Sequence, residues 1–455
     1  MSFSRPFSRS FSSSFSRPFS DPEQGGGGVA PGDPTLIVND RFLTSLPSEW
    51  TFERQGFQYF EDQSGALVRV ESDDVPVFEH RNGLPRGLFM ERVEANQQGG
   101  SEAFTGAEWD APENASINTT TRQAPNLEND IVELVEDNTD SVHLLPAAST
   151  SLGTAANTLS IYVRETSSRR LLIDADSAMG ASALYDLTPG SPSVAASSGS
   201  ASNLDARVWR IGNGFVRLIL TGTGTGVATR IGISIALPSH GATTPQSYLG
   251  DGSSGLDIWG YKRETRDYVT SYTETPPGAG SAGRSDMFLS RPVAGLPATD
   301  FTFLFEFMLP FDHDRDKTTS PRMVVFGNGV DENDSIEIFL SRNNQGLISE
   351  KTVSGLPSRA IAFANEPLYQ EGHIYRVAVT HIDGVGGRAS FNGSPINTNT
   401  SAEWRTPFTS APSVISIGLR RATPGITADL YARELKVWNR ALTDAELIAE
   451  SAALI

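Results

Sequence analysis

Two acidic loops carry the residues best suited to hold a metal ion. In the first loop three aspartates alternate after an apolar run: Asp312, Asp314 and Asp316. Carboxylate oxygens are the ligands that Ca²⁺ prefers, although this loop lacks the glycine and the closing glutamate of an EF-hand. The segment 327–334 (GNGVDEND) is a second candidate. The alternative is a solvated loop in which Arg315 and Lys317 balance the charge, and no other cofactor is predicted.

Common catalytic patterns are missing from the sequence. There is no cysteine, and the histidines at 80, 143, 240, 313, 373 and 381 show no zinc-ligand spacing. No Gly-x-Ser-x-Gly elbow occurs, and no strand carries the Glu-x-Asp-x-x-Glu pattern of jelly-roll glycosidases. The sequence does not exclude a glycosidase pair of carboxylates that come together only in the folded protein. We therefore expect that the protein is not an enzyme.

Aromatic side chains near the middle of the chain suggest a sugar platform. Trp259, Tyr261 and Tyr268 follow one another within ten residues, with Tyr272 just beyond. Aromatic faces of this kind stack on sugar rings. The alternative is packing, because a tryptophan in an Ile-Trp-Gly strand commonly belongs to a core.

Phenylalanine and arginine recur in the low-complexity N-terminal peptide, in which SFSRPFS occurs twice. These residues are Phe3, Arg5, Phe7, Arg9, Phe11, Phe15, Arg17 and Phe19. Prolines and serines disfavour a helix. We interpret the peptide as an anchor whose aromatics fill pockets on a larger partner while its arginines meet carboxylates. The alternative is a disordered tail.

Composition and charge limit the partners, the location and the fold class that we expect for this protein. The 455 residues carry a net charge of −18, which argues against nucleic acid as a partner of most of the chain. No apolar run is long enough to span a membrane, and no signal peptide is recognisable. We expect a protein made in a host cytoplasm, without membrane insertion. The 42 glycines and 27 prolines favour a β-rich fold with many turns.

Short alternating runs predict strands along most of the chain. Predicted strands include 36–38, 56–60, 66–71, 130–135, 157–164, 170–175, 208–211, 214–220, 228–235, 256–261, 268–273, 301–309, 323–326, 335–341, 373–382, 388–392 and 414–419. The tract Gly222–Gly226 predicts a hairpin turn rather than a nucleotide-binding loop, since no helix pattern follows it. Near the end, Thr443 and Glu446 predict the capping box of a short helix.

Two separated segments resemble parts of phage tail-fibre and other virion proteins. The later one resembles the last segment of a carbohydrate-binding-like β-sandwich, and the earlier one resembles the adaptor ahead of that sandwich. The later segment keeps Tyr248, the run Gly250–Gly255, Ile258-Trp259-Gly260, Glu264, Ser271-Tyr272, Thr275 and Arg284-x-Asp286. The earlier one, within 57–96, keeps Phe57-x-Tyr59-Phe60, Gly87-Leu88 and Glu91 before Asn96. Glu94-Ala95 and Tyr261-Lys262-Arg263 depart from the family pattern.

The C-terminal segment resembles laminin-G-like, concanavalin-type jelly rolls. It carries Leu435, Val437 and Trp438 ahead of the capped helix, and Ala389–Gly393 (ASFNG) matches the strand and Asn-Gly turn of that family. The resemblance implies a fold and leaves the ligand undefined.

Together the resemblances predict an all-β protein with two sandwich or jelly-roll domains in tandem behind an extended N-terminal peptide. We expect five segments: an anchor (1–33), an adaptor (34–103), a carbohydrate-binding-like sandwich (104–275), a linker (276–290) and a jelly roll (291–455).

This order implies a tail fibre or head spike on the surface of a virion or phage-like particle. Residues 1–20 would bind capsid or tail proteins, and the distal jelly roll would bind host surface polysaccharide. Family resemblance alone implies a homotrimer. The alternatives are a polysaccharide depolymerase on the same particle and an architectural capsid or tail protein without a host ligand.

Overall fold

The computed structural model describes residues 33–92, 94–128, 131–285, 287–311, 322–328, 334–340, 347–353, 356–363, 370–418 and 428–452. The regular secondary structure of the described residues is nearly all antiparallel β-strand, which confirms the predicted fold class. The anchor residues from Phe3 to Phe19, the aspartates at 312, 314 and 316 and most of the second acidic loop lie outside the described residues.

One sandwich is built from strands between residues 115 and 264, within the predicted range 104–275. Its first sheet has the order β16 (Asp205–Arg210), β17 (Val216–Thr223), β12 (Ala156–Glu165), β20 (Gly255–Glu264), β9 (Val132–Glu136) and β8 (Ala115–Thr119). Its second sheet has the order β11 (His143–Ser151), β18 (Ala228–Ala236), β13 (Arg170–Ala175), β14 (Ala181–Asp186) and β15 (Ser193–Ser198). Buried aliphatic residues such as Leu159, Ile173 and Leu218 fill the space between the sheets.

A second sandwich contains the remaining large sheets. The eight-stranded sheet has the order β30 (Asn397–Asn399), β29 (Gly386–Phe391), β28 (Ile374–Ile382), β23 (Phe301–Met308), β32 (Leu430–Trp438), β6 (Leu84–Met90) and β5 (Phe78–Arg81), and β1 (Leu36–Arg41) also pairs with β32. The seven-stranded sheet has the order β2 (Thr51–Glu53), β22 (Phe288–Pro292), β31 (Val414–Ile417), β24 (Arg322–Gly327), β25 (Ser335–Leu340), β26 (Leu347–Val353) and β27 (Leu356–Phe363).

Short elements connect and cover the sandwiches. Three small ribbons pair β3 (Gln58–Glu61) with β4 (Leu67–Val70), β7 (Glu94–Asn96) with β21 (Ala282–Arg284), and β10 (Asp140–Ser141) with β19 (Tyr248–Leu249). The helices are α1 (Asp176–Met179), α2 (Ala402–Arg405) and α3 (Asp444–Ser451). Among the described residues no helix is long and apolar enough to span a membrane.

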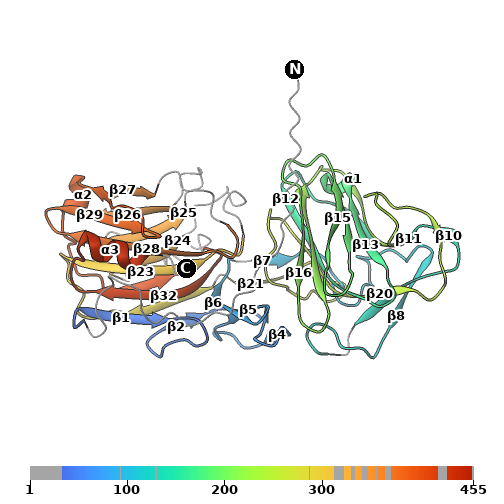
Figure 1. Ribbon diagram of the computed structural model, residues 1–455, viewed down its shortest axis with the longest axis horizontal. Helices are drawn as coiled ribbons and strands as arrows, with labels where there is room; N and C mark the ends of the chain where they lie inside the picture. The colour runs from blue at the N-terminus through green and yellow to red at the C-terminus, as the bar shows by residue number, and fades with distance from the viewer. Residues whose placement is uncertain are drawn as a thin grey trace, which may run out of the picture.

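The predicted adaptor, 34–103, does not form a separate unit. Its strands β1 and β6 both pair with β32 near the end of the chain, and β2 pairs with β22. In Figure 1 these blue strands lie in the same body as the orange and red ones, while the green strands form the other body. The first sandwich is therefore inserted into the second, and the chain leaves and returns through the paired strands β7 and β21.

Two local predictions are also wrong. The stretch Tyr268–Thr273 forms no strand, because the side chains of Glu91 and Asn96 bind its backbone instead. Gly222–Gly226 is not a hairpin turn, since β17 and β18 belong to opposite sheets of the first sandwich. The capping box at Thr443 and Glu446 is confirmed, with both reciprocal hydrogen bonds present.

Strand β23 shows why an alternating pattern can be buried on both faces. Its phenylalanines, Phe303 and Phe305 among them, enter the main core of the second sandwich. On the other face Leu304 packs under α3, beside Leu447. Glu306 shares that face and forms buried ion pairs with Arg376 and Arg433. The polar positions of this strand are therefore buried and paired rather than exposed to solvent.

Candidate functional site

The three aromatic residues predicted to form a sugar platform lie in the interior. Trp259 and Tyr261 are fully buried, and Tyr268 is 7% exposed. The Trp259 ring packs against Tyr272 at 4.7 Å between ring centroids, and Tyr268 stacks on Phe311 at 4.1 Å. The platform prediction is therefore wrong for this structure, because these rings present no open face to a ligand. Their role is packing, which was the alternative.

The residues of the two family-like segments meet in space between the sandwiches, in a region that we call the joint. It is formed by the linker at Glu91–Asn96, the stretch that follows β20, and Asp429 beside β32. The carboxylate of Glu91 accepts hydrogen bonds from the backbone N–H of Ser271 at 2.9 Å and from its hydroxyl at 2.7 Å. The amide of Asn96 donates to the carbonyls of Tyr261 and Thr273 at 3.0 and 2.9 Å. Side chains thus hold together the two segments in which the chain passes from one sandwich to the other.

Buried charges in the joint are paired. Asp429 accepts from the N–H and the Nε of Arg92 at 2.7 and 2.9 Å and from Arg266 at 3.0 Å, and it also binds the hydroxyl of Tyr268. Burial raises the pKa of Asp429, but the two arginines and the Tyr268 hydroxyl outweigh it and hold that pKa at about 2. The joint is therefore a desolvated contact in which the buried charges are paired.

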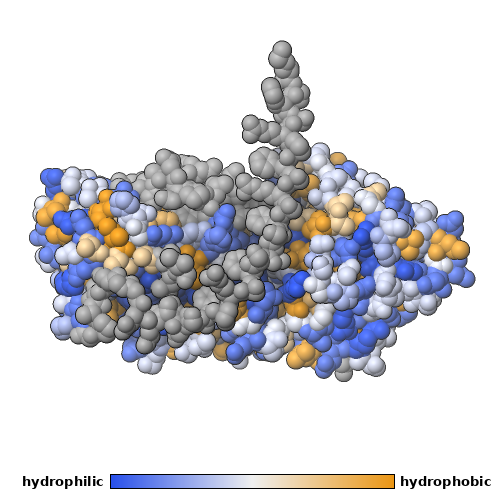
Figure 2. Space-filling view, in the orientation of Figure 1, coloured by the Kyte–Doolittle hydropathy of each residue, from blue (hydrophilic) through white to orange (hydrophobic). Residues whose placement is uncertain are grey.

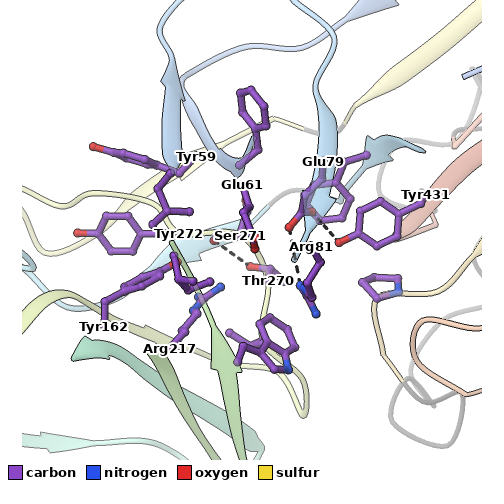
Figure 3. A pocket seen from close by; sticks show the side chains of 17 residues that line it. Tyr59, Glu61, Glu79, Arg81, Tyr162, Arg217, Thr270, Ser271, Tyr272 and Tyr431 are labelled. Carbon is purple, nitrogen blue, oxygen red and sulfur yellow. Dashed lines mark hydrogen bonds and ion pairs between the residues drawn. The ribbon is translucent and has the colours of Figure 1, made fainter. Parts of the chain in front are cut away.

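A small cavity lies beside the joint (Figure 3). Figure 3 shows Glu61, Glu79 and Arg81 from one side and Tyr162 and Arg217 from the other pointing towards it. Its volume is about 30 Å³, which is room for roughly two water molecules. Burial, partly opposed by Arg81, raises the pKa of Glu61 to about 7. This cavity is too small for a sugar residue, so we do not assign it a glycan.

An open depression at one end of the first sandwich has the size that a short oligosaccharide needs. Three loops build it: 165–170 between β12 and β13, 186–193 between β14 and β15, and 210–216 between β16 and β17. Two adjoining hollows of about 560 and 330 Å³ share Glu165, Thr188 and Pro189. We call the two hollows together the loop-end groove. Its lining includes Arg164, Glu165, Thr166, Ser167, Ser168, Arg169, Arg170, Asp186, Thr188, Pro189 and Arg210.

The charged groups of the loop-end groove are fixed by partners. Arg170 binds Asp186 at 2.6 Å, and Arg164 binds the buried Asp257 at 2.7 Å. The hydrogen bond from the Thr188 hydroxyl, and then the contact with Arg170, hold the pKa of Asp186 below its usual range. Burial acts in the opposite direction and is outweighed. Burial first, and then the nearby Asp186, raise the pKa of Glu165. The groove thus offers fixed guanidinium, carboxylate and hydroxyl groups.

Such a lining can bind the hydroxyl groups of sugars. Planar guanidinium and carboxylate groups form paired hydrogen bonds with two neighbouring oxygens, which gives orientation as well as affinity. The aromatic ring of the lining, Phe215, is buried, and Arg164 covers it at 4.5 Å from the ring centroid. On the coloured part of the face in Figure 2, hydrophilic and neutral residues predominate and apolar residues lie in scattered spots. Recognition here would therefore be polar rather than by stacking.

The first of the three loops of the groove lies between the predicted strands 157–164 and 170–175, and the groove was not predicted. The signal lies in the run RETSSRR, Arg164–Arg170, where three arginines and three hydroxyl residues follow a buried strand. The partners of these residues come from loops far along the chain, 186–193 and 210–216. Among the described residues no group of three or more His, Cys, Asp or Glu side chains could hold a metal ion.

Comparison with known proteins gives partial likenesses in fold. No family model matches the chain, and no curated protein matches it. Domain 4 of AbnA, a GH43 extracellular arabinanase from Geobacillus stearothermophilus in complex with arabinotriose, has a TM-score of 0.29 and 15% identity over 36% of this chain and 73% of that one. The Ruminococcus gnavus IT-sialidase CBM40 has a TM-score of 0.27 and 16% identity over 34% and 85%. A SAP-like pentraxin from Limulus polyphemus has 0.26 and 16% over 35% and 72%. At such scores these neighbours define neither ligand nor site.

Proposed function

We propose that this chain is a fibre or spike protein on the surface of a phage or phage-like particle and that it binds host surface polysaccharide. Its N-terminal peptide, residues 1–20, attaches it to capsid or tail proteins. The polysaccharide lies in the loop-end groove of the inserted sandwich rather than on the distal jelly roll. A homotrimer would multiply weak individual contacts into firm attachment.

The loop-end groove is the observation that carries the binding part of this proposal. Its hollows of about 560 and 330 Å³ are open to solvent, and their lining combines fixed charges with hydroxyl groups. Binding sites for small ligands typically have this size and a few convergent polar groups. The joint supports the structural part, because a desolvated contact between two sandwiches makes one stiff arm.

Filling the groove tests the binding site. Pro189 is exposed and lines both hollows, so Pro189→Trp blocks them without removing a charge. Val227, 59% exposed, lies in the connection at the opposite end of the same sandwich, and Val227→Trp is the matched control. On an array of bacterial polysaccharides we expect the unchanged chain and the control to bind and Pro189→Trp to lose binding. Equal binding by all three would refute the site.

Deleting residues 2–20 tests attachment. We expect particles assembled with the shortened chain to lack the protein after purification, while the shortened chain keeps its affinity for polysaccharide. Particles that still carry it would contradict the anchor. Light scattering of the purified full-length chain tests the trimer by its mass.

The rival function, a polysaccharide depolymerase, has one observation in its favour. Glu165 and Asp186 line the same hollow, and their surroundings shift their pKa values in opposite directions, upwards for Glu165 and downwards for Asp186. Such separation is typical of the acid and base of glycosidases. Release of reducing ends by the purified chain, abolished in Glu165→Gln, would favour this rival. Binding without release favours attachment alone.

A further inference from the structure

The lining of the loop-end groove contains more arginines than carboxylates, although the protein as a whole is acidic. Four arginines line its two hollows against the carboxylates of Glu165 and Asp186: Arg164, Arg169, Arg170 and Arg210. The whole chain carries a net charge of −18. Positive charge concentrated in a concave region raises the local concentration of anions. The lining thus presents guanidinium groups to a ligand, although carboxylates behind it pair with three of the four arginines.

Three of these arginines are held in place by carboxylates at their backs. Arg169 binds the buried Glu136 at 2.7 Å, in addition to the pairs of Arg164 with Asp257 and of Arg170 with Asp186. Arg169 also binds Asp251 at 3.1 Å. A guanidinium has five N–H donors, so these partners still leave donors for a ligand. Fixed donors lose little conformational entropy when a ligand binds. These arginines form a preorganised wall.

Arg210 differs from the other three. It is exposed at the end of β16 and donates from Nη2 to the carbonyl of Gly190 at 2.6 Å, which joins two of the loops across the smaller hollow. Within the part of the chain that the structure describes, it forms no ion pair. Its charge is therefore available to a ligand anion.

We propose that the loop-end groove selects acidic polysaccharides and that Arg210 pairs with their anionic substituent. The inference rests on the proposed glycan-binding function and adds the class of ligand to it. The planar guanidinium fork matches a carboxylate or a sulfate through two hydrogen bonds. Neutral sugars would keep the hydrogen bonds between their hydroxyl groups and the wall of arginines, but they would lack this pairing.

Calorimetric titration of the full-length chain with size-matched oligosaccharides tests the inference. The probes are a uronate oligosaccharide, its carboxyl-reduced neutral form and a sulfated oligosaccharide. We expect the uronate or the sulfated probe to bind at least about tenfold more tightly than the reduced one, with affinity falling as salt rises. Tighter binding of either anionic probe supports an acidic polysaccharide as the ligand, and the probe that binds identifies the anionic substituent as a carboxylate or a sulfate.

Two variants separate a specific contact from general charge. Arg210→Gln removes the proposed partner, and Arg230→Gln is the control, since Arg230 is an exposed arginine on β18 that pairs with Asp110 and Glu113. We expect Arg210→Gln to lose about tenfold for the anionic probe only, with an unchanged melting temperature, and Arg230→Gln to bind normally. Equal affinity for anionic and neutral probes, or equal losses in both variants, would overturn the acidic preference while leaving glycan binding intact. Binding of no probe would refute the proposed function itself.

Discussion

Replacing Asp429 by asparagine would test the joint between the sandwiches. The Asp429 side chain is 1% exposed and faces the guanidinium groups of Arg92 and Arg266 and the hydroxyl of Tyr268. Asparagine has nearly the same shape and can still accept the hydrogen bond from the Arg92 backbone. It places an amide donor opposite two cations, however, and removes their counter-charge. The variant thus isolates the charge from the packing.

The expected loss follows from the pairing and from the pKa. The pKa of Asp429 falls from 3.8 to about 2 in the folded protein. This difference means that the folded state favours the charged over the neutral carboxyl group by roughly 2–3 kcal/mol. Removing one partner of a buried ion pair typically costs about 3–5 kcal/mol. We expect Asp429→Asn to lower the free energy of unfolding by about 2–5 kcal/mol at pH 7.

Urea unfolding at several pH values measures this loss. Because the folded pKa is below the unfolded one, the stabilisation is complete above about pH 4 and disappears as the pH falls through 2. The difference between the unchanged chain and the variant should therefore shrink over that range. The control is Asp110→Asn, which breaks an exposed pair with Arg230 and should cost less than about 1 kcal/mol. Similar small losses in both variants, or a difference independent of pH, would refute the reasoning.

Three further predictions concern stability. The pKa of Glu61 rises from 4.5 to about 7 in the folded protein, so the free energy of unfolding should fall as pH rises over that range. Glu61→Gln should remove this fall and stabilise the chain at pH 8 by up to about 3 kcal/mol, as urea unfolding at pH 5 and pH 8 would show; an equal effect at both pH values would contradict it. Thr443→Ala removes a cap of α3 and should cost about 1 kcal/mol in the same assay, and no measurable loss would contradict the capping role. Gly260→Ala forces a side chain onto a φ of +61° and within 3.0 Å of the Tyr162 ring, so a loss of about 1–3 kcal/mol is expected; a neutral effect in thermal unfolding would contradict the close approach.

Local patterns allowed much of the strand content to be predicted. Runs such as 157–164 and 301–309 alternate or stay apolar over the length of a strand, and the structure has β12 and β23 there. The cap of α3 was predictable because both of its residues lie within four positions. These features depend on residues that are close in sequence, so a single sequence was enough to predict them.

Pairings between distant segments could not be predicted. Strand β1 pairs with β32 across almost four hundred residues, and no local pattern specifies that partner. The adaptor was therefore predicted as a separate unit, although its strands complete the second sandwich. Likewise Tyr268–Thr273 alternates like a strand, but its backbone hydrogen bonds go to the side chains of Glu91 and Asn96.

The candidate site was hidden for the same reason. Its lining comes from three loops that only the fold brings together, and its polar residues looked like the end of a strand and ordinary turns. The aromatic residues Trp259 and Tyr261 led to a wrong prediction, because Tyr261 belongs to the core of the first sandwich and Trp259 packs in a buried aromatic cluster with Tyr162 and Tyr272. Residue type alone does not separate a binding surface from a core.

Hydrogen exchange of the full-length chain with and without a bound host polysaccharide tests the central claim most directly. We predict that the ligand slows exchange in the loops 165–170, 186–193 and 210–216 and leaves the second sandwich unchanged. Protection confined to the second sandwich, or none in these three loops at saturating polysaccharide, would contradict the assignment of the groove.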